Sequence, residues 1–376
     1  MNFIKTPYLQ LPENDGITVM WETDRLSTSQ LLIWEASCPE CGAVKYSPEG
    51  EPLTFYGEDG YVHKVAVSGL GDGRDYCYQV ISCTAETELR SEILVFRTKS
   101  FKDGAFSFAV TSETGGSGSP LPVIEKLVRA ISGERPDFLL FVGDMVDDGR
   151  RKQDWDDFMF TPFRSLISNT PFYHCAGNHE EHAGHMKEFL ATSEKGYYDF
   201  TFGCAHFIAL DSTQLADYTE DENGRYISMK LTQELTMDNP QIQFLSDCLK
   251  NSSSKWKFVY MHYSPYVSAT WEGKVLRPLC EIFEKYNVDI VFTSHTIVYE
   301  RSHPLRNDSI DSKGVRYIVV GGAGAQPDWF HHKKAWHTAK SRAVPHFAHV
   351  SISAECLEFQ AIDLEGRLFD SFILQN

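Results

Sequence analysis

Residues 138–149 read FLLFVGDMVDDG and contain the strongest structural signal in the chain. Leu139 to Val142 are four consecutive apolar residues, a pattern typical of a short strand buried on both faces. The run ends at Gly143-Asp144, so we expect the Asp144 carboxylate just beyond the carboxyl end of the strand. Ligands of open α/β sheets bind at such ends, and a carboxylate there can bridge two cations. Asp144 is therefore the predicted centre of a functional site.

The composition is that of a globular protein. The chain has 376 residues, of which 42% are hydrophobic and 23% charged, and it is long enough for two domains. A formal net charge of −17 disfavours nucleic acid and anionic membranes as partners. A small phosphorylated substrate would then need local cations to attract it, which indicates bound metal. No run of apolar residues is long enough to predict a membrane-spanning segment.

The N-terminus, Met1–Pro7, lacks the basic and then apolar layout of a signal peptide. We expect a cytoplasmic protein, or a secreted one whose signal was removed before this numbering begins.

The nine cysteines are odd in number and scattered, which favours reduced thiols over a disulfide framework. Cys38 and Cys41 have the spacing of a zinc knuckle, and with Cys77 and Cys83 they would form a four-thiolate zinc site. The alternative is free thiols or one local disulfide, and the unusual spacing of the second pair favours it.

Residues 1–99 are predicted to form a small antiparallel β-sandwich. Short segments of alternating polarity are separated by turn residues such as Glu13–Gly16 and Gly71–Gly73, which is typical of such sandwiches. The expected strands are Ile17–Trp21, Leu31–Trp34, Val62–Val67, Tyr76–Val80 and Leu94–Phe96.

From about Lys99–Gly104 onward, strands alternate with helices, so residues 100–376 are predicted to form an α/β layered domain. The expected strands include 106–110, 138–142, 171–176, 206–210, 258–261 and 290–292, and the expected helices include 121–131, 155–168, 241–250 and 276–286.

Four polar residues each follow one of these strands: Asp144, Asn178, His262 and His295. One carboxylate, one amide oxygen and two imidazoles form a plausible ligand set for Zn²⁺, Fe²⁺ or Mn²⁺. The alternative is that each merely caps a strand or turn. Glycine or serine beside three of them, and His179 directly after Asn178, favour the metal site.

The order of these motifs resembles that of calcineurin-like metallophosphoesterases, and within them of purple acid phosphatases. The matching segments are Gly143-Asp144, Gly177-Asn178-His179-Glu180, Met261–Pro265 and Ser294–Arg301, supported by Thr6–Gln10, Ile17–Trp21, Tyr197–Phe200, His206–Ser212 and Tyr317–Gly324. The resemblance implies a fibronectin III-like sandwich followed by a four-layer αββα domain.

The resemblance also implies a dinuclear metal site that hydrolyses phosphate esters. Asp144 would bridge two cations, which would activate a water molecule and hold the phosphate oxygens. His179 would protonate the leaving alkoxide or stabilise the transition state. The alternative for His179 is that it only orients a ligand.

Three departures from the family pattern fall on the first cation site. Glu113 stands where the family has a metal-binding aspartate, Asp147 where it has a tyrosine, and Ile297 where it has a second histidine. Glu113, Asp144 and Asp147 would remain there, an all-oxygen set that suits Mg²⁺, Mn²⁺ or Fe³⁺ and disfavours zinc, or that holds no metal. His182 or His185 could substitute, although histidines of polar loops are more often solvated. The second site, formed by Asp144, Asn178, His262 and His295, keeps its full ligand set.

Three hypotheses for the function follow: a metal-dependent phosphoesterase with an atypical first site, a slow single-metal hydrolase, and a binding protein that has lost catalysis. The expected cofactors are two metal ions, iron, manganese or zinc. The choice between monoester and diester stays open. The loops near the site carry aromatic residues and the basic segment His331–Lys334, which either contact substrate or pack the loops and lie in solvent.

Overall fold

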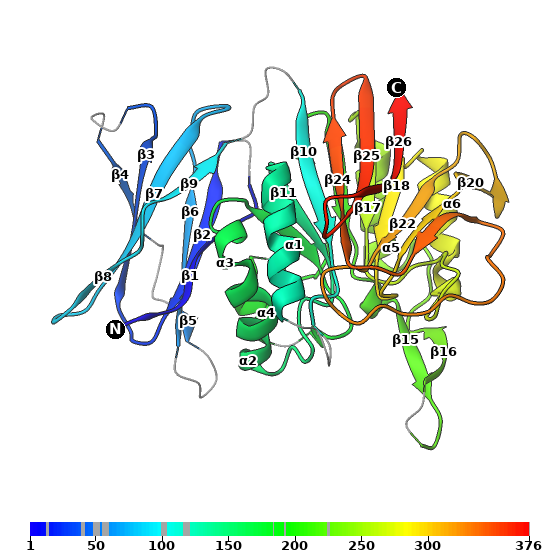
Figure 1. The fold of residues 1–376 in the computed structure, drawn as a ribbon, viewed down its shortest axis with the longest axis horizontal. Coiled ribbons are helices and arrows are strands. Elements are labelled where there is room, and N and C mark those ends of the chain that lie inside the picture. The colour runs from blue at the N-terminus through cyan, green and yellow to red at the C-terminus, as the bar shows by residue number, and fades with distance from the viewer. Residues whose placement is uncertain are drawn as a thin grey trace.

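The structure is a computed structural model that describes residues 1–12, 15–38, 42–47, 53–54, 60–98, 104–115, 121–182, 184–191, 193–223 and 226–375. Glu13, Asn14, Cys41 and the predicted boundary at residues 99–103 lie outside these ranges, so the division at 99/100 stays a prediction. A β-sandwich forms one end of the molecule and a larger α/β region forms the rest (Figure 1). None of the helices in the described ranges combines the length and apolarity needed to cross a membrane.

The N-terminal sandwich has two antiparallel layers, as predicted. One layer contains β1 (Phe3–Gln10), β2 (Ile17–Thr23), β6 (Tyr61–Val67) and β5 (Leu53–Thr54). The other contains β4 (Val44–Tyr46), β3 (Thr28–Glu35), β7 (Asp75–Cys83) and β8 (Glu88–Arg90), with β9 (Leu94–Arg97) paired to β7. Alternate residues of these strands, Trp21, Leu31 and Tyr78 among them, point inward and form one buried core.

The α/β region contains two further sheet layers. The first has parallel strands β10 (Phe106–Thr111), β11 (Phe138–Val142) and β12 (Phe172–Cys175), followed on one side by antiparallel β24 (His346–Ile352), β25 (Cys356–Asp363) and β26 (Leu368–Gln375). The second is ordered β13 (Tyr198–Phe202), β14 (Ala205–Ala209), β17 (Trp256–Tyr260), β18 (Ile290–Thr293), β22 (Arg316–Val320), β19 (Tyr299–Ser302) and β23 (Thr338–Arg342), in which β14, β17, β18 and β22 are parallel.

Helices cover the outer faces of both sheets, which confirms the four-layer αββα architecture (Figure 1). On the first sheet lie α1 (Leu121–Glu134), α2 (Lys152–Asp154), α3 (Thr161–Ile167) and α4 (Gly184–Phe189). On the second lie α5 (Pro240–Asn251) and α6 (Pro278–Lys285). Between the sheets, a largely aromatic core joins Phe108 and Phe138 of one sheet to Phe207 and Phe258 of the other.

The helix expected over 155–168 has a different geometry from the prediction. Trp155–Phe160 forms a π-helix that continues into α3. Apolar periodicity identifies a buried helical face but does not distinguish an α-turn from a π-turn, because both place Trp155, Met159 and Phe160 in the same core.

The sandwich and the α/β region share one continuous sheet. Strand β1 pairs in parallel with β12 through Gln10 and Phe172, so the first layer of the sandwich extends the first sheet of the α/β region to ten strands. The Gln10 side chain donates to the Phe189 carbonyl at 2.9 Å and accepts from the Ala191 amide at 2.6 Å. Tyr8 donates to the same Phe189 carbonyl at 2.8 Å.

A buried ion cluster crosses the same junction. Lys5 of β1, whose side chain is 0% exposed, lies 2.6 Å from Glu22 of β2 and 2.6 Å from Asp156 of the π-helix. Lys152 completes the cluster at 3.2 Å from Glu22. The Lys5 ammonium also lies over the Phe189 ring, 3.7 Å from its centroid.

The cysteines only partly follow the prediction of reduced thiols. Cys77 and Cys83 of β7 are free, but Cys38 is disulfide-bonded, which is a correction. An oxidised sulfur is no thiolate ligand, so the four-thiolate zinc site is not formed in this state.

Candidate metal centre

The candidate ligands lie where parallel strands end. Asp144 follows β11 and Asn178 follows β12 in the first sheet, while His262 follows β17 and His295 follows β18 in the second. Because the two sheets pack face to face, the carboxyl ends of these strands meet at one edge of the domain.

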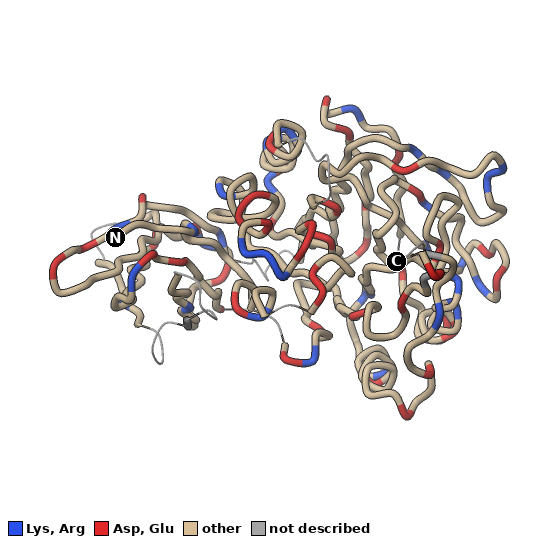
Figure 2. The backbone as a smooth tube through the Cα atoms, turned by 90° about the horizontal axis from the view of Figure 1, so that it is seen from below, with Lys and Arg blue, Asp and Glu red and all other residues tan. Residues whose placement is uncertain are grey.

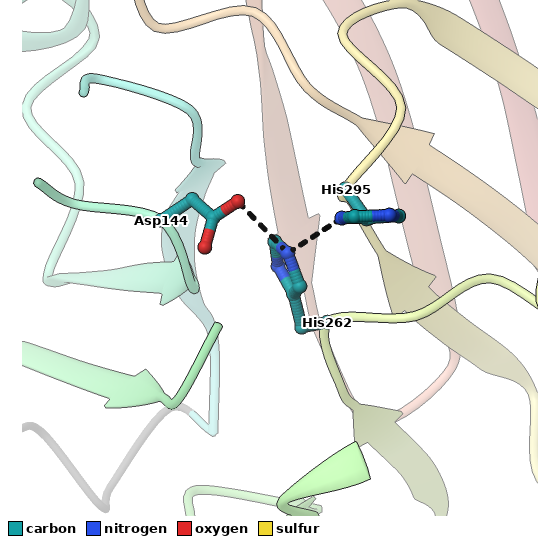
Figure 3. Close-up of side chains that lie close together, drawn as sticks. All are labelled: Asp144, His262 and His295. Carbon is teal, nitrogen blue, oxygen red and sulfur yellow. Dashed lines mark hydrogen bonds and ion pairs between the residues drawn. The ribbon is translucent and has the colours of Figure 1, made fainter. Parts of the chain in front are cut away.

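Four donor atoms converge on one point. Nε2 of His262 lies 3.0 Å from Oδ2 of Asp144, 3.1 Å from Oδ1 of Asn178 and 3.2 Å from Nδ1 of His295. Figure 3 shows the Asp144 carboxylate and the two imidazoles facing one another. Ligand atoms bound to one cation at about 2.0–2.2 Å lie about 3 Å apart. The side chains therefore fit a single N/O-ligated metal ion.

The histidine rings are held with the correct nitrogen toward this point. Nδ1 of His262 lies 2.9 Å from the Val142 carbonyl, and since a carbonyl only accepts, Nδ1 donates to it and Nε2 is the nitrogen that a cation can bind. His295 turns Nδ1 inward, while its Nε2 lies 2.7 Å from the Tyr218 hydroxyl. Such outer partners fix the tautomer and the orientation of metal-binding imidazoles.

The backbone around the centre is strained. Glu113, Asp144 and His295 adopt φ angles of 64°, 51° and 68°, which non-glycine residues rarely do. Gly143 and Gly177 give the space this requires. A Cβ on Gly177 would lie 2.1 Å from Oδ1 of Asp144, and one on Gly143 would lie 2.6 Å from Nδ1 of His262. The glycines before Asp144 and Asn178 are thus explained by close packing at the centre.

Glu180 fixes the loop that carries Asp144. Its buried carboxylate accepts hydrogen bonds from the amides of Asp144 at 3.0 Å, Met145 at 2.6 Å and Gly177 at 2.6 Å. Burial and the Asp144 charge raise the pKa of Glu180 to about 7. The sequence motif contains Glu180, but its role was not predicted because the bonding partners lie on a separate strand end.

The charges of the metal-free centre are strongly perturbed. Burial lowers the pKa of His262, but the Asp144 carboxylate more than offsets this and raises it to about 9. Burial and the nearby His262 lower the pKa of His295 to about 3. Burial also raises the pKa of Asp144, but His262 outweighs it and holds that pKa below its usual value. A cation that binds here must displace the proton on Nε2 of His262.

His179 lies at the edge of the centre and is half-buried. Its Nδ1 donates to the Asp147 carbonyl at 2.6 Å, its backbone amide donates to Oδ1 of Asp144 at 3.0 Å, and its Nε2 lies 4.0 Å from Oδ2 of Asp144. Burial lowers the pKa of His179, but Asp144 and the Asp147 carbonyl outweigh burial and raise it. Nε2 can therefore hold a proton beside the candidate metal position.

The residues expected at the first cation site do not converge on one point as the donors of the second site do. Within the described part of the chain, only Asp144, His262 and His295 form a group of three histidine, cysteine or carboxylate donors within 4.8 Å of one another. Oε1 of Glu113 instead accepts hydrogen bonds from the Ser294 hydroxyl at 2.6 Å and the His295 amide at 2.7 Å. Burial and the Asp144 charge raise the pKa of Glu113 to about 8. Asp147 lies 3.5 Å from Arg151.

His182 and His185, considered as substitute ligands, do not line the cavity above the centre. Nε2 of His182 lies 2.8 Å from the Thr213 hydroxyl, and its Nδ1 lies 3.5 Å from Asp211. His185 stacks on Phe189, with ring centroids 5.7 Å apart.

A cavity of about 580 Å³ opens above the centre and is strongly acidic. Its lining includes two arginines, Arg150 and Arg151, which are ion-paired with neighbouring aspartates. Ile297 also lines it, and its amide donates to Asp328 at 2.9 Å. Asp328 was missed by the sequence analysis because a loop distant in sequence brings it here. The carboxylates of the lining are Glu113, Asp144, Asp147, Asp148, Glu181, Asp217 and Asp328.

This combination of fold and strand-end ligands defines a class of proteins. Residues 106–299, just over half of the chain, match the family model of calcineurin-like phosphoesterases, and the chain belongs to that family. A purple acid phosphatase of known structure, isolated from yellow lupin (Lupinus luteus) seeds, has the same fold, with a TM-score of 0.84 at 18% identity over 98% of this chain and 74% of that one.

Among curated proteins, the chain is similar to purple acid phosphatases. It is 30% identical to purple acid phosphatase 13 of Arabidopsis thaliana over 200 residues, which is 46% of this chain and 31% of that protein. It is 24% identical to purple acid phosphatase 21 of the same plant, over 84% of this chain and 70% of that protein. It is 25% identical to acid phosphatase type 7 of Homo sapiens, over 71% and 65%. The chain thus spans between about one third and 70% of the length of these relatives.

Proposed function

We propose that this protein is a metal-dependent phosphoric ester hydrolase that acts on small phosphorylated substrates. The observation that supports this best is the convergence of Asp144, Asn178 and His295 within 3.2 Å of Nε2 of His262. A mixed set of two imidazoles, a carboxylate and an amide oxygen suits zinc, iron or manganese. Among the relatives is the Fe(3+)-Zn(2+) purple acid phosphatase 12 of Arabidopsis thaliana.

A bound cation supplies Lewis acidity that lowers the pKa of a coordinated water and neutralises phosphate charge. The protein side chains supply the rest. Asp144 accepts a hydrogen bond from the His179 amide, and Nε2 of His179, 4.0 Å from Oδ2 of Asp144, carries the proton for the leaving alkoxide. The Asp147 carbonyl fixes that ring, because it accepts from Nδ1 and leaves only Nε2 to face the cavity.

Electrostatics make the cation essential for substrate binding. Seven carboxylates line the cavity, and its two arginines are already paired with aspartates. A phosphate dianion would be repelled from this surface without bound metal. We infer that metal loading precedes substrate binding.

A second candidate function, a slower hydrolase with a single metal, is favoured by the position of Glu113. Its carboxylate accepts from Ser294 and from the backbone of His295, and its pKa is raised to about 8, so it is protonated at neutral pH when no cation is present. Ile297 adds no ligand atom to this side of the cavity. One cation would then position both the attacking water and the substrate, which gives less catalysis than two.

Elemental analysis of the purified protein, together with hydrolysis of phenyl phosphate in added Mn²⁺, Fe²⁺ or Zn²⁺, tests these functions. We expect turnover that Asp144→Asn abolishes and that Asp247→Asn, an exposed control on α5, leaves unchanged. Two metals per chain support a dinuclear enzyme, and one supports the single-metal hydrolase. Absence of turnover with every metal would contradict both and would leave a phosphoesterase-fold binding protein.

A further inference from the structure

A second cavity, of about 490 Å³, lies beside the candidate metal centre. Two segments supply its lining: residues 267–272 with 274 and 277, and residues 331, 333 and 335–337. Trp271 is part of the lining of both cavities. The two segments are joined by the bridge between Ala269 and Phe330 and by a hydrogen bond of 3.2 Å from the His331 amide to the Ser268 carbonyl. The walls of this cavity are therefore held together by backbone contacts.

Trp271 separates the two cavities in an unusual conformation. Its φ of 66° is an outlier for a bulky residue, and its side chain is partly exposed. Its ring centroid lies 5.5 Å from that of Tyr218 and 6.1 Å from that of His295, so it reaches the metal centre on one side. Backbone strain of this kind is concentrated at ligand-binding positions.

The second cavity carries positive charge, unlike the first. Lys274 and Lys333 are exposed on its lining and form no ion pair within the described residues, whereas Arg277 donates to Glu272 at 2.8 Å. Because that pair is neutral, the two lysines leave a net positive lining in a protein of formal charge −17. Acidic residues are spread over the molecule (Figure 2). A locally positive lining is therefore where an anion would bind in preference to the surrounding surface.

Two buried polar atoms of this lining have unused hydrogen-bonding capacity. Oγ1 of Thr270 and Nδ1 of His337 are buried and have no hydrogen-bond partner within the described chain. His337 is only 2% exposed. Nδ1 of His337 lies 3.7 Å from the buried Glu300 carboxylate, so Oγ1 of Thr270 is the one of the two atoms without a charged neighbour.

We propose that the second cavity binds another anionic group of the substrate, so that the preferred substrate is a phosphate ester whose alcohol part carries a second phosphate or a similar anion. This inference rests on the proposed phosphoesterase function. The ester phosphate occupies the cation-loaded centre, the second anion lies against Lys274 and Lys333, and the linking part crosses Trp271. Complementary charge in two adjacent cavities fixes which end of the substrate reacts.

The kinetic test compares 1,4-phenylene bisphosphate with phenyl phosphate. We expect kcat/KM to be about 10-fold or more higher for the bisphosphate, since hydrogen bonds to charged groups are among the stronger ones. The double variant Lys274→Ala/Lys333→Ala should lower that ratio to about two, the statistical value for two equivalent phosphates. Lys334→Ala is the matched control, because Lys334 lies next to Lys333 but outside the cavity and donates to the Ala339 carbonyl at 3.2 Å. An unchanged ratio in the double variant would overturn the proposal, and would assign any preference to the aromatic rings.

A binding test separates this inference from the proposed function. Inorganic phosphate is titrated calorimetrically into metal-free protein, in which the acidic cavity repels anions. We expect weak binding that falls at least about 10-fold in Lys274→Ala/Lys333→Ala and persists in Lys334→Ala. Absent binding, or equal binding in all three proteins, contradicts the anion site. If no ester is hydrolysed with any metal, the phosphoesterase proposal fails, while this titration still decides whether the anion site exists.

Discussion

The hydroxyl of Tyr218 lies 2.7 Å from Nε2 of His295, on the side of the ring that faces away from the candidate metal position. Tyr218 belongs to β15 (Ala216–Glu220), which pairs with β16 (Tyr226–Leu231) in a hairpin that projects from the domain (Figure 1). A candidate ligand of the centre is thus oriented by an element outside both main sheets.

Tyr218→Phe should weaken metal binding or lower kcat/KM by about 10- to 100-fold, the usual cost of removing an outer partner of a ligating histidine. Tyr263→Phe is the matched control. Its ring also contacts His295, with centroids 4.8 Å apart, but its hydroxyl forms no hydrogen bond with the described residues. Metal titrations and phenyl phosphate kinetics measure both variants. Equal effects of the two would show that ring packing, not the hydroxyl, orients His295.

Ile297→His should restore a nitrogen donor to the first cation site. Ile297 lines the same cavity as Glu113 and Asp147 and has its amide bound to Asp328. If the unmodified chain holds one metal, we expect the variant to hold about two and to turn over faster, because two cations position the water and the substrate better than one. Elemental analysis measures the stoichiometry, and Ile297→Leu controls for volume. An unchanged metal content would mean that this side of the cavity cannot hold a cation.

The protein loaded with iron should lack a purple colour. Asp147 occupies the position at which the purple acid phosphatase pattern has its tyrosine ligand, so no tyrosinate-to-iron band should appear in the visible spectrum. Asp147→Tyr should introduce such a band if iron binds beside this position. A visible tyrosinate band in the unmodified protein would refute the assignment of Asp147.

Lys5→Ala should destabilise the protein by about 3–5 kcal/mol, because it leaves the buried Glu22 and the adjacent Asp156 without their shared cation. The matched control is Lys126→Ala, which breaks an equally short ion pair of 2.6 Å with Glu365 where both side chains are about half exposed. Exposed pairs contribute about 0–1 kcal/mol. Urea unfolding measures both, and similar losses would contradict a stabilising role of the buried cluster.

Acid should destabilise the protein below about pH 6.5 through buried neutral histidines. Burial lowers the pKa of His63 to about 4 and that of His174 to about 3, so the unfolded chain binds protons that the folded chain does not. The contribution of these neutral histidines to the unfolding free energy is complete above the pKa of about 6.5 in the unfolded chain and is lost as the pH falls towards 4.

His63 tests this prediction away from the metal centre. Its nitrogens contact Ser29 and Thr23, and its ring stacks on Trp21 at 4.9 Å. When the pH falls from 7 to 4.5, the unfolding free energy of the unmodified protein should fall by about 2–3 kcal/mol more than that of His63→Gln. Urea unfolding at both pH values provides the measurement. An identical loss in the variant and the unmodified protein would show that His63 already binds its proton in the folded state.

The layers and the convergence of the four candidate ligands were predictable because their signals are local. An apolar run that stops at Gly143-Asp144 or Gly177-Asn178 defines both the strand and the position of its ligand. The motif order then assigned the family, which the family match confirms. The disposition of Glu113 and Asp147 was not predictable, because hydrogen bonds from Ser294 and His295 decide where the Glu113 carboxylate turns.

Tyr218 and Asp328 carry no local signal of a role. Each lies in a hairpin or loop whose position depends on the packing of distant segments, as the bonds of Tyr218 to His295 and of Asp328 to Ile297 show. The pairing of β1 with β12 was also missed. Alternating polarity predicts a strand but not its neighbour in a sheet.

The pairing of β1 with β12 also gives the N-terminal sandwich a protective role. Without residues 1–98, the edge of β12 at Phe172 would be exposed, and the Phe189 carbonyl would lose both Tyr8 and Gln10. Exposed edge strands pair with strands of other molecules and lead to aggregation. The sandwich thus occupies part of this edge of the phosphoesterase sheet, which disfavours pairing of that edge with a second chain.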